Sequence, residues 1–298
     1  MKNPKHFKLT TPVLFLIFNR LETTKKVFGE IRKAKPTKLY IAADGPRNEE
    51  EKKKTDAVRK YVLSHIDWPC KVKTLFREKN LGCRIASNKA ISWVLNLEDR
   101  CMVLEDDTIP SKTYFRFMQE ILEYYKNNEK IMSVGGVNFL KRVNISESYF
   151  FSKVHTSGTG IWRRSWQKQD LDVKRYLEIE KSNELYKYIP NIIERVLWKK
   201  RVKDMLSRKV DSWGYAFQIA HFINRGLCVI PKVNLIKNIG FDEEATHTRF
   251  NKIDKKYISL PKFELKFPLV HPKKIEINKE LEKKLLILEI KRILLKRL

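Results

Sequence analysis

Short apolar runs alternate with charged, amphipathic segments over the first 135 residues or so. The apolar runs, each of strand length, fall at residues 13–18, 39–43, 70–76, 100–104 and 131–134. Apolar side chains recur at helical spacing in the segments between them, at residues 22–33, 49–64, 82–95 and 111–127. Strands that alternate with helices in this way form βαβ units. The pattern therefore predicts an α/β fold with a mainly parallel central sheet flanked by helices.

The pattern changes after about residue 140. Basic stretches with helical character are expected at residues 171–187 and 191–209, and a short strand at 227–230. The end of the chain, residues 281–298, intersperses Leu and Ile with Lys and Arg and predicts a basic amphipathic helix. We place boundaries near residues 140 and 250.

Polar residues follow several predicted strands at their carboxyl ends. Asn19 and Arg20 follow the first strand, Asp44 follows the second, and Glu105-Asp106-Asp107 follows the fourth. Ligands of open parallel sheets bind at this edge. The sequence thus predicts a ligand site there.

The three consecutive carboxylates are the strongest chemical signal. They repel one another, so folding them after a buried strand calls for a cation or basic partners. Oxygen ligands of this kind suit Mn²⁺ or Mg²⁺, which also bind substrate phosphates. The alternative is a solvated turn or the first turn of a helix, where acidic residues are also favoured.

The other polar positions have two interpretations each. Asp44, in Asp-Gly-Pro, can close an Asx turn, and Asn80, Arg84 and Asn88 can belong to a capped helix start. The functional alternative is a polar rim that binds a nucleotide, with Arg20 and Arg84 balancing a diphosphate.

Composition adds a strong positive charge. The 298 residues include 62 Lys and Arg against 35 Asp and Glu, for a net charge of +27. Such a field attracts nucleic acid, an anionic bilayer or phosphorylated small molecules, although a Lys-rich solvated surface has the same composition. The basic residues are spread along the chain with no nucleic-acid-binding signature, so no nucleic-acid partner is expected. Four cysteines without CxxC spacing argue against a disulfide scaffold or zinc ribbon.

In order along the chain, these motifs resemble those of GT-A nucleotide-sugar glycosyltransferases, in particular bacterial family 2-like sugar transferases. The resemblance rests on Phe18-Asn-Arg, Asp44-Gly-Pro, Asn80-Leu-Gly and Glu105-Asp-Asp. The last also looks, more distantly, like the metal motif of the N-acetylglucosaminyltransferase I type. Segments 155–166, 211–226, 231–240 and 245–248 extend the resemblance over residues 11–250, although an aromatic Trp-Gly-Trp element is here Ser157-Gly-Thr.

The resemblance implies roles for individual residues. Asp107 would bind the metal, His247 would lie near it on a loop, and Asp211 would be the catalytic base. The nucleotide-sugar pocket would be lined by Phe18, Asn19, Arg20, Asp44, Asn80, Arg84, Asn88, Glu105 and Asp106. The acceptor or sugar pocket would contain Gly158, Gly160, Trp162 and Trp213. Each has a structural alternative: Asp211 as a helix N-cap, Trp213 as a core residue, His247 as a surface loop residue.

The resemblance further implies a GT-A fold in three parts. Residues 1–140 would form the nucleotide-sugar-binding half, 141–250 the half with the acceptor site and the base, and 251–298 a basic tail. The activity would be an inverting, Mn²⁺- or Mg²⁺-dependent transfer of a sugar from a UDP- or GDP-linked donor to a glycan or lipid-linked acceptor, in surface polysaccharide or glycoconjugate synthesis. A basic nucleic-acid-binding protein and an inactive carbohydrate-binding relative stay open as alternatives.

The sequence also predicts where in the cell the protein is found. No apolar run reaches the length of a membrane span, so we expect a cytoplasmic protein, with peripheral attachment to the inner face of the cell membrane as an option. The basic tail would either lie on anionic lipid or pack against the domain or a second subunit. Homo-oligomer formation stays open.

Overall fold

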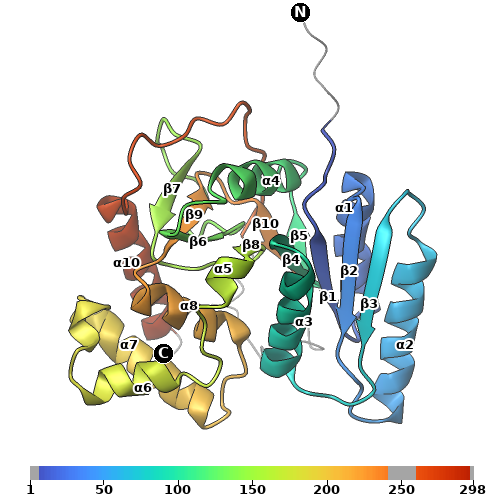
Figure 1. Cartoon of the computed structure of the whole chain (residues 1–298), viewed down its shortest axis with the longest axis horizontal. Coiled ribbons are helices and arrows are strands. Elements are labelled where there is room, and N and C mark those ends of the chain that lie inside the picture. Colours follow the sequence, from blue (N-terminus) through green and yellow to red (C-terminus); the bar gives the residue numbers. More distant parts are fainter. Residues whose placement is uncertain (1–6, 241–259, 296–298) are drawn as a thin grey trace, which may run out of the picture.

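A sheet of eight strands runs through the computed structural model, which describes residues 7–240 and 260–295 (Figure 1). Its strand order is β3-β2-β1-β4-β8-β6-β9-β7, and β7 and β8 run against the common direction of the others. Its strands are β1 (Val13–Ile17), β2 (Lys38–Ala43), β3 (Lys71–Phe76), β4 (Arg100–Glu105), β6 (Ile131–Val134), β7 (Tyr149–Ser152), β8 (Thr159–Trp162) and β9 (Leu227–Pro231). A separate antiparallel pair joins β5 (Thr108–Pro110) to β10 (Ile236–Asn238). The predicted α/β class is confirmed.

Helices cover both faces of the sheet. They are α1 (Leu21–Ala34), α2 (Glu49–Ser64), α3 (Cys83–Leu97), α4 (Tyr114–Tyr124), α5 (Arg163–Trp166), α6 (Lys174–Lys181), the 3₁₀ turn η1 (Leu185–Lys187), α7 (Ile192–Leu206), α8 (Trp213–Ile223) and α10 (Lys279–Leu295). Side chains of β1 alternate between the two faces, as expected for a strand. Phe15 joins the core under α1, α2 and α4, whereas Leu14 joins the core under α3 and α8.

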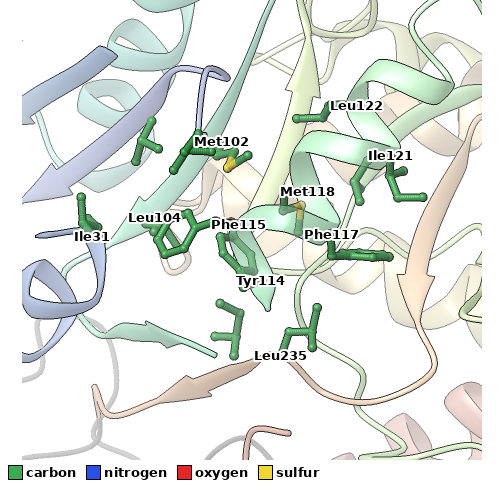
Figure 2. Close-up of a cluster of buried hydrophobic side chains, with 14 of the residues drawn as sticks. Ile31, Met102, Leu104, Tyr114, Phe115, Phe117, Met118, Ile121, Leu122 and Leu235 are labelled. Atoms are coloured by element: carbon green, nitrogen blue, oxygen red, sulfur yellow. The ribbon is translucent and has the colours of Figure 1, made fainter. Parts of the chain in front are cut away.

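Helix α4 supplies the largest share of one core. Figure 2 shows Tyr114, Phe115 and Phe117 of this helix gathered with Met102 and Leu104 of β4. The helix begins at Tyr114, although the amphipathic pattern predicts a start near residue 111. The short strand β5, at residues 108–110, precedes it and was not predicted.

The second half departs further from the predicted elements. Residues 171–187 divide into α6 and η1 because Asn183 takes a left-handed backbone conformation with φ of 57°, which ends a helix. Helix α8 is apolar almost all round, so its sequence has no amphipathic period to reveal it. Strands β7 and β8 have four residues each, too few for a clear alternation.

The register of the strands determines which residues meet at the carboxyl edge of the sheet, where the sequence predicts a ligand site. Ile17 of β1 lies opposite Ala43 of β2, and Leu16 lies opposite Glu105 of β4. The residues that follow these strands therefore meet at one edge. Because β8 is antiparallel to β4, its last residue, Trp162, lies opposite Arg100, at the far end of β4 from that edge.

The C-terminal helix packs on the domain. Leu281 and Leu285 of α10 are buried with Phe150 and Ile230, and Ser152 Oγ donates a 2.7 Å hydrogen bond to Glu282. Of the two predictions for the tail, packing against the domain is the one that these contacts show. Among the described residues, no helix combines the length and the apolar character needed to cross a bilayer.

His221 of α8 is a buried titratable group in the core. Its Nε2 lies 2.8 Å from Ser133 Oγ, and its Nδ1 lies 2.8 Å from the Phe217 carbonyl oxygen. Burial lowers the pKa of His221 to about 4 from an ordinary 6.5. Between these values the unfolded chain binds more protons than the folded protein, so the free energy of unfolding falls as the pH is lowered from 6.5 toward 4.

We predict that this residue contributes about 2 kcal/mol to the loss of stability between pH 7 and pH 5. Urea denaturation of the parent and of His221→Gln at both pH values measures this contribution. The free energy of unfolding of the variant should fall less between pH 7 and pH 5 than that of the parent, whatever its value at pH 7. An equal loss in the two proteins would contradict the prediction.

Candidate functional site

The acidic triplet lies in a tight turn at the end of β4. Thr108 Oγ donates to the Glu105 carbonyl oxygen (2.9 Å) and accepts from the Glu105 N–H (3.0 Å), which folds the chain back after Asp107. The Ile239 N–H then donates to the Asp107 carbonyl oxygen at 2.8 Å. Asp106 is 6% exposed, and α4 begins only at Tyr114. The triplet is therefore neither a solvated turn nor a helix start.

Arg20 provides the nearest positive charge. Its Nη2 donates to Asp106 Oδ1 at 2.6 Å and to Asp107 Oδ2 at 3.0 Å. Although burial works against its charge, the two carboxylates raise the pKa of Arg20 above its ordinary value. Asp106 Oδ2 and Asp107 Oδ1 are buried and have no hydrogen-bond partner among residues 7–240 and 260–295. The triplet thus keeps acceptor capacity that Arg20 does not use.

Burial changes the acidity of two carboxyl groups of the triplet. Burial, aided by the charge of Asp107, raises the pKa of Glu105 above its ordinary value. Burial also raises the pKa of Asp106, although Arg20 acts in the opposite direction. Trp213 Nε1 donates to Glu105 Oε1 at 3.2 Å. A further cation beside Asp107 would stabilise the ionised forms.

The donor set fits a cation that shares its coordination shell with a substrate. Asp106 and Asp107 each have a carboxylate oxygen without a partner in the described part of the chain. Mg²⁺ in proteins is commonly held by one or two carboxylates together with phosphate oxygens. No group of three or more His, Cys, Asp or Glu side chains within the described residues forms a complete metal cage. His247 lies outside the described residues.

Gly240 permits a close approach of the chain to the triplet. A Cβ at this position would lie 2.1 Å from Asp107 Oδ2, so a larger residue would displace the carboxylate. The sequence contains the run Asn238-Ile-Gly, but nothing in it indicates that this glycine meets the triplet, because the contact depends on β10 pairing with β5.

Asp44 and Asn80 connect the end of β2 to the start of α3. Asp44 accepts from the N–H groups of Gly45 (2.9 Å), Leu81 (3.0 Å) and Gly82 (3.0 Å), and Asn80 Nδ2 donates to the Gly45 carbonyl oxygen at 2.7 Å. Burial raises the pKa of Asp44 above its ordinary value, whereas these N–H groups act to lower it. The geometry is that of a turn-forming Asp, the structural alternative expected for Asp-Gly.

Asn19 belongs to a polar pocket beside the end of β1. Asn19 Nδ2 donates to Glu51 Oε1 at 2.9 Å, and Arg47 also binds Glu51 through its backbone and side chain. Asn19 Oδ1 is buried and accepts no hydrogen bond from the described residues. The pocket, about 210 Å³, is lined by Asn19, Arg47, Asn48, Glu50, Glu51 and Lys54. Sequence reasoning missed Glu51 and Arg47, since a charged first turn is common in helices.

The ring of Phe18, the residue before Asn19, lies under the Arg47 guanidinium at 5.9 Å. Phe18 is therefore a neighbour of the polar pocket.

Asp211 lines the same cavity as Glu105 and faces Arg84. Arg84 Nε lies 3.5 Å from Asp211 Oδ1, and Gly82, with φ of 81°, approaches so closely that a Cβ would lie 2.9 Å from Asp211 Oδ2. The N-cap of α8 is Ser212, and no side chain caps the helix. Asp211 is thus not the N-cap that the structural alternative predicts.

Asp211 and Glu105, the first residue of the triplet, both line a cavity of about 590 Å³. Trp213, Trp198 of α7 and Leu285 of α10 also line it. Residues from all three predicted segments of the chain therefore line a single cavity. The boundaries between those segments stay a prediction.

The other residues predicted near the acceptor are packing residues. Trp162 is 2% exposed, donates from Nε1 to the Leu122 carbonyl oxygen at 3.0 Å and lies at the opposite edge of the sheet. A Cβ on Gly160 would meet Leu122 at 3.0 Å, and one on Gly158 would meet Ile236 at 2.6 Å. Of this predicted set, Trp213 lines the cavity and Trp162 does not, because β8 runs antiparallel to β4. Asn88 of α3 is buried, and its Nδ2 has no partner among the described residues.

Comparisons with known proteins give distant structural similarity. No protein-family model matches the chain, and no curated protein matches it in sequence. Among solved structures, TarS 1-349 from S. aureus aligns over 76% of this chain and 59% of its own, with 10% identity and a TM-score of 0.41. HddC from Yersinia pseudotuberculosis aligns over 52% of this chain and 77% of its own, with 13% identity and a TM-score of 0.34.

We predict that Arg20→Met destabilises the protein by about 3 kcal/mol, because it leaves buried carboxylates without their cation. Chemical denaturation at pH 8 measures the loss. Arg32→Met is the control, since Arg32 pairs with Asp67 on the surface, and it should have little effect. Equal effects of the two substitutions would show that the triplet does not depend on Arg20.

Proposed function

We propose that the protein is a glycosyltransferase that moves a sugar from a UDP- or GDP-linked donor to a glycan or a lipid-linked acceptor. The observation that carries the proposal is the acidic triplet at the carboxyl edge of a mainly parallel sheet, whose first residue, Glu105, lines the same cavity as Asp211. The motif order described above supports the same assignment. The wider role would be in surface polysaccharide or glycoconjugate synthesis.

The donor would bind over the ends of β1 and β4. Asp107, with Asp106, would hold Mn²⁺ or Mg²⁺, which supplies positive charge for the departing diphosphate. Arg20 already lies beside these carboxylates and would share that role. The pocket around Asn19 and Glu51 offers donors and acceptors for the nucleoside.

The acceptor would enter the cavity beside Asp211. In an inverting transfer the acceptor oxygen forms a bond to the anomeric carbon while the bond from that carbon to the phosphate oxygen breaks. Asp211 would take the proton of the acceptor hydroxyl, and the diphosphate would carry away the bonding electrons. Arg84 would hold the Asp211 carboxylate in place. The apolar walls from Trp198 and Leu285 would exclude water from the reacting atoms.

Metal-dependent nucleotide binding tests the donor site. Calorimetric titration of UDP and GDP should show binding that strengthens about tenfold or more with Mn²⁺ and loses this gain in Asp107→Asn. Asp67→Asn, a surface carboxylate paired with Arg32, should bind as the parent does. Mn²⁺-dependent binding that persists in Asp107→Asn would overturn the metal assignment.

The catalytic base can be tested separately. Asp211→Asn should reduce transfer by about 10²–10⁴-fold while leaving the affinity for the nucleotide unchanged. The exposed Asp172→Asn serves as the matched control. Full activity in Asp211→Asn would exclude it as the base. A parent protein that binds nucleotide but transfers no sugar from a panel of donors would identify an inactive carbohydrate-binding relative.

A further inference from the structure

Helix α7 has one face in the core and one in water. Its residues Trp198, Val202 and Met205 are buried against α8 and α6. On the other side, Ile192, Ile193 and Val196 are 67%, 50% and 61% exposed. Three β-branched apolar side chains in adjacent turns of a water-facing helix surface are unusual, because such a surface normally carries polar residues.

Basic residues continue the exposed face toward the end of α7. Lys199, Lys200 and Lys203 follow Val196 at helical spacing and are exposed. Residues 192–209 contain seven basic and two acidic side chains. Lys199 and Lys200 contact Glu180 and Asp204, but ion pairs so open to water are weak and leave the charge available to other anions.

We propose that this outer face of α7 docks on an anionic lipid bilayer, with the two isoleucines and Val196 inserted between headgroups and the lysines against their phosphates. Apolar insertion combined with basic flanks is the pattern by which helices bind such surfaces. Charge complementarity favours lipid over a second copy of the chain, because the protein carries +27 and would repel itself. Three side chains also give less apolar area than the roughly 800 Å² that each partner buries in a stable protein interface.

This surface differs from the one predicted from the sequence. The C-terminal helix α10 uses Leu281 and Leu285 to pack on the domain, so those residues cannot enter a bilayer. The inner face of α7, by contrast, contributes Leu197 and Trp198 to the cavity that contains Asp211. If the proposed function holds, a lipid-linked acceptor would meet the cavity on the side of the molecule that α7 occupies, but docking itself does not depend on that function.

Vesicle flotation of the full chain, without donor or acceptor, tests the docking. One set of vesicles contains phosphatidylcholine alone and the other about one third phosphatidylglycerol. The α7 variant carries Val196→Ser, Lys200→Gln and Lys203→Gln. A matched control on α2 carries Leu63→Ser, Lys53→Gln and Lys60→Gln, all at exposed positions. Circular dichroism verifies that both variants fold.

The parent should bind the anionic vesicles, bind neutral ones weakly, and lose binding as salt is added. The α7 variant should bind about tenfold or more weakly, and the α2 control should bind as the parent does. Equal binding by parent and α7 variant overturns the proposal, as does an equal loss in the α2 control. A parent that is dimeric in light scattering and becomes monomeric in Ile192→Ser/Ile193→Ser would instead identify the face as a contact between copies.

Discussion

The ion pairing of Arg20 with Asp106 and Asp107 is the interaction on which the rest of the site depends. It holds two carboxylates at the end of a buried strand, where burial raises the pKa of Asp106 and the charge of Arg20 opposes that rise. Because one guanidinium cannot bind all the carboxylate oxygens, one oxygen of each carboxylate has no partner among the residues that the structure describes. Arg20 thus balances part of the negative charge of the triplet and leaves carboxylate oxygens on which the proposed metal site rests.

The surrounding helices and strands bury the end of β4 and hold the turn that follows it. The β4 strand is covered on one face by α4 and on the other by α3 and α8, and the turn after Asp107 is held by β5 and β10 (Figures 1 and 2). Trp213, the first residue of α8, lines the cavity and donates a hydrogen bond to Glu105 at the end of β4. Glu105 and Asp211 therefore line the same cavity, although about a hundred residues separate them in the chain.

The sequence predicted the first half of the fold well, because each βα unit there has its own period of apolar residues. Features that depend on pairing between distant segments could not be predicted from it. The antiparallel direction of β8 turns Trp162 into the core, and the pairing of β10 with β5 brings Gly240 to Asp107; neither has a local signal. Apolar α8 lacks a helical period for the same reason that it is stable, namely that it is buried on most sides. The sequence pattern singles out the triplet, Arg20 and Asp211 as candidates, and their roles stay predictions. It does not single out Glu51, since its partners Asn19 and Arg47 come from other parts of the chain.

The most direct test is a crystal structure of the protein grown with Mn²⁺ and UDP or GDP, with anomalous scattering used to locate the metal. The geometry of the triplet predicts one Mn²⁺ within coordination distance of Asp107 and of the diphosphate, with Asp211 facing the open side of the cavity. A diphosphate bound elsewhere, or bound at this edge with Mn²⁺ absent and Arg20 alone as its cation, would contradict the assignment of Asp107 as the metal ligand.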